Sequence, residues 1–253
     1  MDRLRTSPRS LFWWLRIRAY YWKKFFWAGE RELSILSSWV NPRKLAVDVG
    51  GNAGVYTYHL SRLAKDVITF EPNPAYVALM LSANLRSRIE PVALSDSSGE
   101  GRLRFPRFGG KEYGGMASLA GAAVSDDVLS REILVPIRRL DDYELLELGF
   151  LKIDVEGHEE AVLAGARETI ARCRPSILVE IEEAHNPGGI RRITELLSSH
   201  GYEGTFYYKG SIIPIIRFDS AKHQLDHIKA HRSRSRRRDL DYVNNFVFVP
   251  REF

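Results

Sequence analysis

Five apolar runs of strand length alternate with helical stretches through residues 45–182, and this alternation constrains the fold more than any other feature of the chain. The runs are LAVDVG, VITFEP, EPVAL, FLKIDV and SILVEIE, and the helical stretches between them are Val55–Ala64, Ala75–Arg86 and Glu159–Cys173. A strand followed by a helix and another strand predicts a βαβ unit with parallel strands and a right-handed crossover. The sequence therefore predicts an α/β fold with a Rossmann-like, doubly wound and mostly parallel sheet.

The regions that flank this alternation have different patterns. Glu30–Val40 predicts a short helix that Asn41-Pro42 ends. Near the other end, GTFYYKG and NNFVFVP are rich in strand-forming residues, and we expect them to pair antiparallel at one edge of the sheet. Hydrophobic residues make up 44% of the 253 residues, as in ordinary globular proteins. We therefore expect one domain over residues 30–253.

Positive charge is concentrated in two segments outside the predicted sheet. Residues 1–28 hold seven lysines and arginines against one aspartate, and residues 231–238 hold five arginines and no acid. The formal net charge of the chain is +5, so the rest of it is acidic, with a net charge of −6. An acidic body argues against a nucleic-acid substrate, because gripping its backbone needs a continuous basic surface.

The N-terminal segment, residues 1–29, predicts a basic and aromatic helix that begins at Ser7-Pro8. Arg9, Arg16 and Lys23 share one stripe of this helix, and the segment is dense in tryptophan, tyrosine and phenylalanine. Two interpretations stay open: a helix on an anionic membrane surface, or a helix packed on the core or on a partner subunit. A second basic segment, residues 219–241, is predicted as an insertion before the last strand.

The location of the protein is predicted from its cysteine content and its apolar stretches. The single cysteine, Cys173, fits a reducing compartment. No segment reaches the roughly 20 consecutive apolar residues of a transmembrane helix. We therefore expect a cytoplasmic protein, peripheral to the inner face of a membrane if the N-terminal helix binds lipid.

A glycine-containing loop follows the first predicted strand and contains Asp48, Gly50, Asn52 and Gly54. Glycines at this place let the backbone approach a ligand that lies across the strand tip. The spacing is G-x-x-x-G, unlike the G-x-G-x-x-G loop that holds the pyrophosphate of a nicotinamide dinucleotide. An acid two residues before the first glycine also suits an ammonium group better than a phosphate.

Acidic residues follow the second and third predicted strands. Glu71 lies 21 residues after Gly50, the offset at which a carboxylate accepts hydrogen bonds from ribose hydroxyls in nucleotide-binding α/β units. Ser95 and Asp96 follow the third strand, where an adenine edge lies if the pocket is built in strand order. Ser-Asp-Ser-Ser-Gly is also an ordinary turn sequence. Together with the glycine loop, Glu71 predicts a nucleoside site at this edge of the sheet.

Charged residues follow the fourth and fifth predicted strands. Lys152, Asp154 and Glu156 alternate with apolar residues, which places them on one side of the fourth strand. Charges in a central strand are costly to bury unless they are paired or functional. The fifth strand ends in Glu180, and His185 follows it. These groups predict a catalytic site at the carboxyl edge of the sheet.

Over roughly residues 30–250, the chain resembles the FkbM-type family of class I methyltransferases. The motifs that carry the resemblance are AVDVGGNAGVYT, FEPNP, VALSDSSGE, RRLDDY, FLKIDVEGHEEAVLAGA, RPSILVEIE and NNFVFVP. The resemblance implies a seven-stranded sheet with an antiparallel last strand. It also implies transfer of a methyl group from S-adenosyl-L-methionine to a hydroxyl of a sugar, glycan or natural product.

The same resemblance implies a role for each loop. The methionine part of the cofactor would lie against the loop of Asp48, Gly50, Asn52 and Gly54. Glu71 would bind the ribose and Asp96 the adenine amine. Asp154 would lie beside both the sulfonium and the acceptor.

The predicted reaction needs a general base or a metal ion, because an alcohol is a poor nucleophile at neutral pH. The candidates for the base are Asp154, Glu156, Glu180 and His185. Asp154 with a neighbouring carboxylate can instead hold Mg²⁺, which prefers oxygen ligands. Three other functions fit parts of the sequence: an RNA methyltransferase that uses the arginine-rich segments, a nicotinamide-dependent sugar dehydrogenase, and a non-catalytic nucleotide-binding module.

Overall fold

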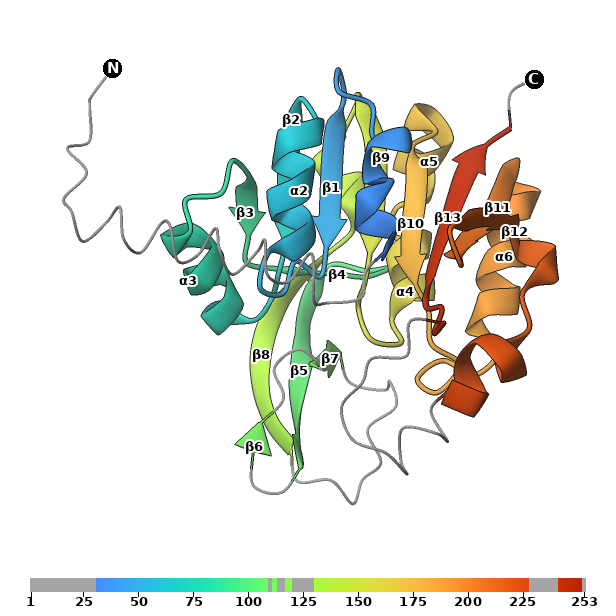
Figure 1. Ribbon diagram of the computed structural model, residues 1–253. Helices are drawn as coiled ribbons and strands as arrows, with labels where there is room; N and C mark the ends of the chain where they lie inside the picture. The colour runs from blue at the N-terminus through green and yellow to red at the C-terminus, as the bar shows by residue number, and fades with distance from the viewer. Residues whose placement is uncertain (1–30, 109–110, 113–116, 120–129, 228–240, 252–253) are drawn as a thin grey trace, which may run out of the picture.

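The computed structural model describes residues 31–108, 111–112, 117–119, 130–227 and 241–251 (Figure 1). At its centre is an eight-stranded sheet in the order β12-β11-β13-β10-β9-β1-β2-β3. The strands of this sheet are β1 (Leu45–Val49), β2 (Asp66–Phe70), β3 (Arg88–Glu90), β9 (Leu148–Ile153), β10 (Ser176–Glu180), β11 (Tyr202–Tyr208), β12 (Ser211–Pro214) and β13 (Asn245–Pro250).

The direction of the strands confirms the predicted mostly parallel sheet with an antiparallel last strand. β3, β2, β1, β9 and β10 pair in parallel, whereas β13 is antiparallel to both of its neighbours, β10 and β11. The arrowheads of β1 and β10 lie at the same edge, and β13 points the other way (Figure 1). The sheet has eight strands rather than seven because β12 pairs with β11 as an added edge strand. β13 lies inside the sheet and not at its edge.

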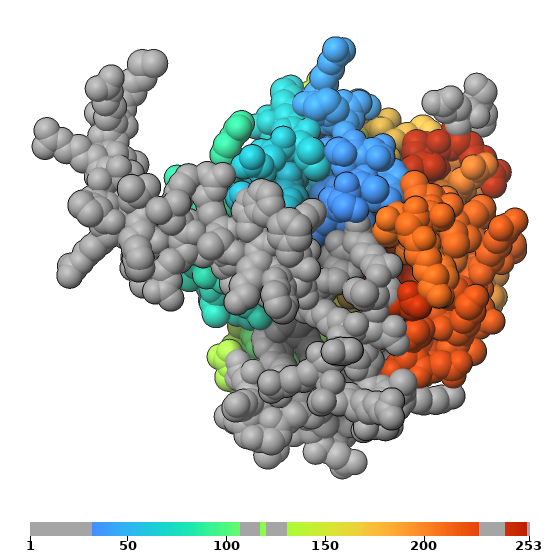
Figure 2. All heavy atoms as spheres, viewed as in Figure 1, coloured from blue at the N-terminus to red at the C-terminus, as the bar shows by residue number. Residues whose placement is uncertain are grey.

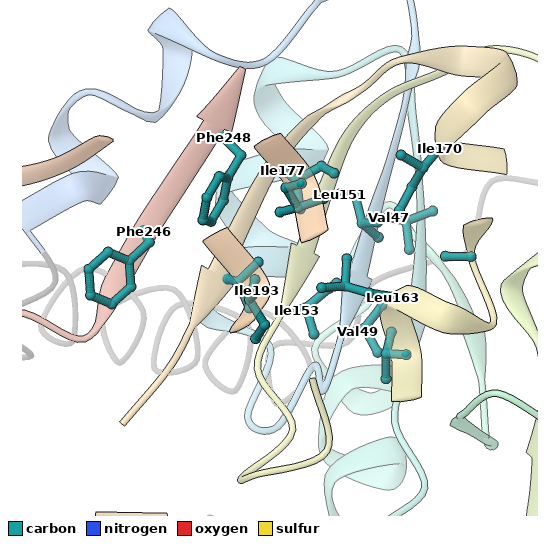
Figure 3. Close-up of a cluster of buried hydrophobic side chains, with 14 of the residues drawn as sticks. Val47, Val49, Leu151, Ile153, Leu163, Ile170, Ile177, Ile193, Phe246 and Phe248 are labelled. Carbon is teal, nitrogen blue, oxygen red and sulfur yellow. The ribbon is translucent and has the colours of Figure 1, made fainter. Parts of the chain in front are cut away.

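Helices cover both faces of the sheet because the central strands are apolar on both sides. On one face, α2 (Val55–Leu63) and the 3₁₀ helices η1 (Arg31–Ser34) and η2 (Leu36–Ser38) pack on Ala46 and Phe150. On the other face, α4 (Glu159–Ala164), α5 (Arg167–Cys173) and α6 (Gly189–Ser199) pack on Val47 and Leu151 (Figure 3). Two buried layers fix the register of the strands and hence the position of each strand end.

The predicted helices are present with two differences. α2 and α3 (Pro74–Ser82) lie where helices were expected, and residues 31–38 form 3₁₀ helices. The single helix expected over Glu159–Cys173 is divided into α4 and α5, which Gly165 separates. A Cβ atom at Gly165 would lie 1.9 Å from the carbonyl oxygen of Ser95, so only glycine permits this contact. Close packing against the Ser95 loop therefore accompanies the break between the two helices.

The described residues between 93 and 138 form a second, smaller sheet that the sequence does not predict. Its strands are β4 (Ala93–Leu94), β5 (Gly99–Phe108), β6 (Lys111–Glu112), β7 (Ser118–Leu119) and β8 (Ser130–Arg138), and we call it the β5–β8 lobe. The lobe has its own hydrophobic cluster of Ala93, Leu103, Phe105, Leu119 and Val135. It extends beyond the edge at which the parallel strands end (Figure 1).

The predicted third strand is divided between the two sheets. β3 belongs to the main sheet and β4 to the lobe, and Pro91, which cannot donate a hydrogen bond, lies between them. The chain therefore leaves the main sheet before it reaches Ser95 and Asp96.

The expected N-terminal helix, residues 1–29, and the arginine run, residues 232–238, lie outside the described residues. The start of the expected insertion is described, and it is anchored. The π-helical turn η6 (Ala221–Leu225) buries Gln224, whose Nε2 donates to the carbonyl oxygens of Ile181 and Val243 at 2.8 and 2.7 Å.

Within the part of the chain that the structure describes, no helix is both long and apolar enough to span a membrane. The orange part of the chain, which contains α6, β11 and β12, lies along one side of the molecule (Figures 1 and 2).

Candidate active site

The loop after β1 is folded tightly against the ends of β2 and β9. The N–H groups of Gly50 and Gly51 both donate to the carbonyl oxygen of Phe70, at 2.9 and 3.2 Å. Gly50 has a φ of +77°, and a Cβ atom there would lie 1.8 Å from the carbonyl oxygen of Asp154. Gly54, with a φ of +83°, begins α2. The backbone of this loop therefore leaves a space that larger side chains in place of the glycines would fill, as the glycine spacing predicts.

We expect Gly50→Ala to lower the free energy of unfolding by roughly 3–4 kcal/mol, because it combines a left-handed φ with an overlap of backbone atoms. Gly210→Ala is the matched control, since Gly210 has a φ of +86° and a Cβ atom added there would meet no atom within 4 Å. That control should lose about 1 kcal/mol. Urea unfolding measures both, and equal losses would contradict a close approach of the loop to Asp154.

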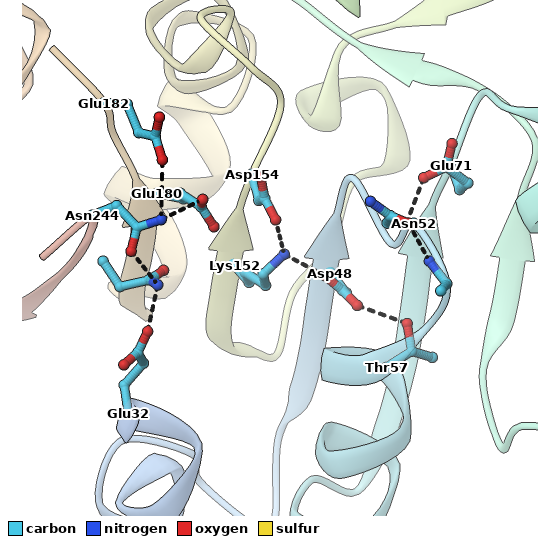
Figure 4. Close-up of polar contacts among 12 residues, drawn as sticks. Glu32, Asp48, Asn52, Thr57, Glu71, Lys152, Asp154, Glu180, Glu182 and Asn244 are labelled. Carbon is cyan, nitrogen blue, oxygen red and sulfur yellow. Dashed lines mark hydrogen bonds and ion pairs between the residues drawn. The ribbon is translucent and has the colours of Figure 1, made fainter. Parts of the chain in front are cut away.

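Both carboxylate oxygens of Glu71 accept hydrogen bonds from backbone N–H groups. Its Oε2 accepts from the N–H of Asn52 at 2.6 Å (Figure 4). Its Oε1 accepts from the N–H of Asn73 at 2.7 Å. The side chain is buried, and Asn52 has a φ of +48°. Burial raises the pKa of Glu71 to about 7, although the two N–H groups lower it, and the charges of Asp48 and Asp154 raise it further. The carboxyl group is held at one orientation and lines the larger of two cavities at the strand ends.

If Glu71 binds the ribose of the cofactor, as the family resemblance implies, binding of S-adenosylhomocysteine should strengthen as pH rises through the pKa of Glu71, because an ionised carboxylate accepts best from ribose hydroxyls. With a pKa of about 7, affinity at pH 6 should be roughly tenfold weaker than at pH 8. Glu71→Gln should bind about 1.5–3 kcal/mol more weakly than wild type at pH 8 and lose this pH dependence. Calorimetry at the two pH values tests both points. A Glu71→Gln variant with wild-type affinity at pH 8 would remove Glu71 from the ribose site.

A buried charge network connects the first and fourth parallel strands. Lys152 Nζ lies 3.0 Å from Asp154 Oδ2 and 3.5 Å from Asp48 Oδ1 (Figure 4). It also lies 4.5 Å from the centre of the Tyr56 ring. Asp48 Oδ2 accepts from Thr57 Oγ1 at 2.6 Å. Burial disfavours the charge on Lys152, but Asp154 and Asp48 outweigh it and raise the pKa of the ammonium group. The network fixes Asp154 at the edge of the sheet with its charge compensated.

A second group of acidic side chains lies beyond the ends of β9 and β10, around a small cavity that we call the acidic chamber. It is lined by Asp154, Glu156, Gly157, Glu159, Glu180, Glu182 and His185. His185 Nδ1 lies 2.8 Å from Glu156 Oε2, and this hydrogen bond raises the pKa of the imidazole. Glu180 Oε1 accepts from Asn244 Nδ2 at 2.6 Å (Figure 4). Burial and the charge of Asp154 raise the pKa of Glu180, while Lys152 opposes them.

The larger cavity, which we call the nucleoside chamber, lies between the main sheet and the lobe. Its lining residues are Val49, Gly50, Asn52, Phe70, Glu71, Pro72, Tyr76, Val92, Ala93, Leu94, Leu103, Ala117, Leu119, Asp154, Val155, Glu156 and His158. Glu71 and Asn52 lie at one part of it and the apolar residues of the lobe at another. Asp154 and Glu156 line both chambers. The two chambers therefore meet at the end of β9, as a transfer reaction between two ligands requires.

The predicted site residues divide into three groups. Gly50, Asn52, Glu71, Asp154 and Glu156 line the nucleoside chamber, while Glu180 and His185 join Asp154 and Glu156 around the acidic chamber. Asp48 is buried beneath the loop and Gly54 begins α2. Asp96 is exposed and is not among the lining residues, and the buried Ser95 contacts His158 instead.

Several functional side chains carry weak sequence signals. The sequence shows that Lys152 is a charged residue in a predicted strand. It does not show that Lys152 pairs with Asp48, because Asp48 belongs to another strand. His158 stands in the KIDVEGHE motif with nothing to indicate that it meets Ser95. Leu103 and Leu119 belong to strands that no periodicity predicts. In the residues that the structure describes, no group of three or more histidine, cysteine, aspartate or glutamate side chains is arranged to hold a metal ion.

The order of the parallel strands, with an antiparallel strand inside one end of the sheet, is that of the class I methyltransferase fold, and a cavity lies at their carboxyl edge. The sequence profile of the methyltransferase FkbM domain matches residues 48–203. The chain therefore belongs to the FkbM family of S-adenosylmethionine-dependent methyltransferases.

The chain is similar to other methyltransferases, of which two are compared below. The 31-O-demethyl-FK506 methyltransferase FkbM of Streptomyces tacrolimicus is 28% identical over 195 residues, which cover 64% of this chain and 74% of that protein. The crystal structure of methyltransferase FkbM from Methylobacillus flagellatus has a TM-score of 0.50 and 15% identity, and the match covers 82% of this chain. This chain spans 44% of that one, less than half of its length. At this level of identity, the similarity to the Methylobacillus flagellatus structure supports the fold of this chain alone.

Proposed function

We propose that this protein transfers the methyl group of S-adenosylmethionine to a hydroxyl group of a sugar, glycan or natural-product acceptor. The observation that carries the proposal is the junction of two chambers at Asp154 and Glu156, one suited to a nucleoside and the other bearing a histidine–glutamate pair. The relative from Streptomyces tacrolimicus, whose name describes methylation at an oxygen, supports the choice of oxygen as the acceptor atom.

The residues of the nucleoside chamber fit S-adenosylmethionine. The Gly50 cradle leaves room that a Cβ atom would fill, and Glu71 offers a buried carboxylate with both oxygens already oriented. Asp48 and Asp154 place negative charge near the end of β1, which suits the ammonium and sulfonium groups. The bound cofactor supplies an electrophilic methyl group on sulfur.

The acidic chamber supplies the proton acceptor. Glu156 accepts from His185 Nδ1, so His185 Nε2 is left to accept the proton of the acceptor hydroxyl. With S-adenosylmethionine bound, the methyl group would pass from sulfur to the acceptor oxygen, and His185 Nε2 would take the proton that the hydroxyl loses. The Glu156 carboxylate stabilises the resulting imidazolium. Asp154, held by Lys152, keeps negative charge beside the transferred group. Magnesium bound at Asp154 is the competing proposal for activating the hydroxyl.

The experiment that tests this function identifies the product. Purified enzyme and S-adenosylmethionine are incubated with glycan, lipid and small-molecule fractions, and mass spectrometry follows a gain equal to one methylene group. Nuclear magnetic resonance then shows whether the new signal is a methoxy group. The His185→Ala variant is the control. A methyl group on nitrogen or on RNA would contradict the proposal, and cofactor binding without any product would support a non-catalytic module.

The acidic chamber also weighs against RNA as the acceptor. Acidic side chains line this cavity, and those that are ionised would repel the phosphates of a nucleic-acid backbone. A nicotinamide-dependent dehydrogenase is excluded by the family match.

We also propose a cytoplasmic enzyme that docks on an anionic membrane through residues 1–28 and the arginine run. The first residues of the insertion, which the structure describes, support membrane docking by the arginine run. Gln224 in this part hydrogen-bonds to Ile181, so the insertion starts beside the acidic chamber. Exposed apolar side chains in the same part of the chain, Ile212 and Ile216, are 50% and 90% exposed. Each basic residue near the surface adds about 1 kcal/mol of attraction.

Vesicle sedimentation should show binding to anionic lipid that weakens with added salt and falls sharply when residues 1–28 are deleted. Neutral vesicles are the control. Equal binding to both lipids, or to neither, would contradict docking and leave the aromatic helix as a packing element.

A further inference from the structure

A buried side chain of the insertion holds the backbone that follows β10. Gln224, in η6, is fully buried. Its Nε2 donates to the carbonyl oxygens of Ile181 and Val243 at 2.8 and 2.7 Å, and its Oε1 accepts from the N–H of Glu183 at 2.9 Å. These partners fix the orientation of the amide, because only its NH₂ group can face two carbonyl oxygens. Gln224 therefore takes the place of a neighbouring strand beyond the end of β10.

The contact with Glu183 reaches His185 through one rigid peptide group. The N–H of Glu183 and the C=O of Glu182 belong to the same peptide group, which is planar. The Glu182 carbonyl oxygen accepts from the N–H of His185 at 3.0 Å and from the N–H of Asn186 at 2.8 Å. Gln224 thus holds one side of this peptide group, and the turn that carries His185 is built on the other side.

The turn that presents Gln224 is itself anchored at several points. The preceding residue, His223, is 3% exposed, and its ring stacks on that of Phe218 with the ring centres 5.2 Å apart. His223 Nδ1 accepts from the N–H of Asp219 at 3.0 Å, and the His223 carbonyl oxygen accepts from the N–H of Val243 at 3.0 Å. Short π-helical segments such as η6 are rare, and they are frequent at functional sites. The amide of Gln224 is therefore held in place from its own side.

We propose that Gln224 is a positioning residue for methyl transfer: its amide holds the backbone around Glu182 at the place where His185 meets Glu156. His185 Nδ1 lies 2.8 Å from Glu156 Oε2, so a small displacement of the turn would break this hydrogen bond. Gln224 is not among the residues that line the acidic chamber, and it acts through the backbone alone. This inference rests on the proposed role of His185 as the proton acceptor.

Gln224→Met removes all three hydrogen bonds and keeps most of the side-chain volume. The ring signal of His185, identified by its absence from the spectrum of His185→Ala, is titrated by nuclear magnetic resonance in the protein without ligands. The hydrogen bond to Glu156 raises the pKa of His185 in wild type, so this pKa should fall toward the ordinary value of histidine in Gln224→Met. Leu36→Ala is the matched control. It removes a fully buried side chain on the other face of the sheet and should leave the pKa of His185 unchanged.

A double-mutant cycle with His185→Ala separates positioning from a general loss of stability. With the acceptor identified by mass spectrometry, Gln224→Met should lower kcat by roughly 10–100-fold. The affinity for S-adenosylhomocysteine should stay within about twofold of wild type. In the His185→Ala background, Gln224→Met should change kcat by less than about twofold, because the group that it positions is gone.

Gln224→Asn is the second variant, because it keeps the amide but is one methylene group too short to reach all three partners. It should shift the pKa of His185 in the same direction, and it decides the test if Gln224→Met does not fold. An unchanged pKa of His185, or equal losses of kcat in the two backgrounds, would overturn the proposal. A wild type that methylates no hydroxyl would overturn the proposed function, and the titration would still show whether Gln224 positions His185.

Discussion

Lys152→Met is expected to lower the free energy of unfolding by about 3–5 kcal/mol, the usual loss when one partner of a buried ion pair is removed. Lys152 is 2% exposed and Asp48 is fully buried, so the substitution leaves a carboxylate without a cation in the core. Methionine keeps most of the side-chain volume, which limits any cavity. Urea unfolding with a two-state fit measures the loss.

Lys65→Met is the matched control for this experiment. Lys65 Nζ lies 3.1 Å from Glu147 Oε2, and the two side chains are 56% and 66% exposed. Because water and salt screen an exposed pair, the control should stay within about 1 kcal/mol of wild type. Equal losses in the two variants would contradict a structural role for the Asp48–Lys152–Asp154 network.

Asp154→Asn should reduce methyl transfer by roughly 10²–10⁴-fold, because it removes the charge at the junction of the two chambers while keeping the side-chain shape. The initial rate with the acceptor identified by mass spectrometry is the measurement. The affinity for S-adenosylhomocysteine and the unfolding free energy are measured beside it, so that a loss of folding is recognised.

The same assay separates the two roles proposed for Asp154. If EDTA abolishes wild-type activity and Mg²⁺ restores it, Asp154 serves as a metal ligand. If activity is insensitive to EDTA, the electrostatic role stands. Full activity of Asp154→Asn would contradict both.

Local signals account for the parts of the site that the sequence predicts. The glycine loop and Glu71 follow strands with strong apolar patterns, and the carboxyl ends of parallel strands meet at one edge. The loop residues Gly50 and Asn52 could therefore be placed beside Glu71 before any contact was known. Glu180 and His185 were expected at the same edge for the same reason, and they line one chamber.

Contacts between distant segments account for what the sequence does not predict. The lobe strands β5 and β8 pair across a segment without strong periodicity, so neither strand is recognisable alone. The Ser95–His158 contact joins residues 63 positions apart. The break between α4 and α5 depends on the room at Gly165, which appears only when the helix meets the Ser95 loop. Which side chains meet in this way depends on the order of the strands in the sheet. The secondary-structure propensities of the residues do not encode that order.

The β5–β8 lobe has a consequence for how the protein responds to its cofactor. One wall of the nucleoside chamber comes from Leu103 and Leu119, which belong to the lobe's own hydrophobic cluster, and the opposite wall comes from the core of the main sheet. A nucleoside bound between them, as proposed, would touch two separately packed hydrophobic clusters. Cofactor binding should therefore slow amide hydrogen exchange in β5 and β8 together with the loop after β1. At the proposed site, the bound cofactor would add contacts between the main sheet and the lobe that the protein without cofactor does not have.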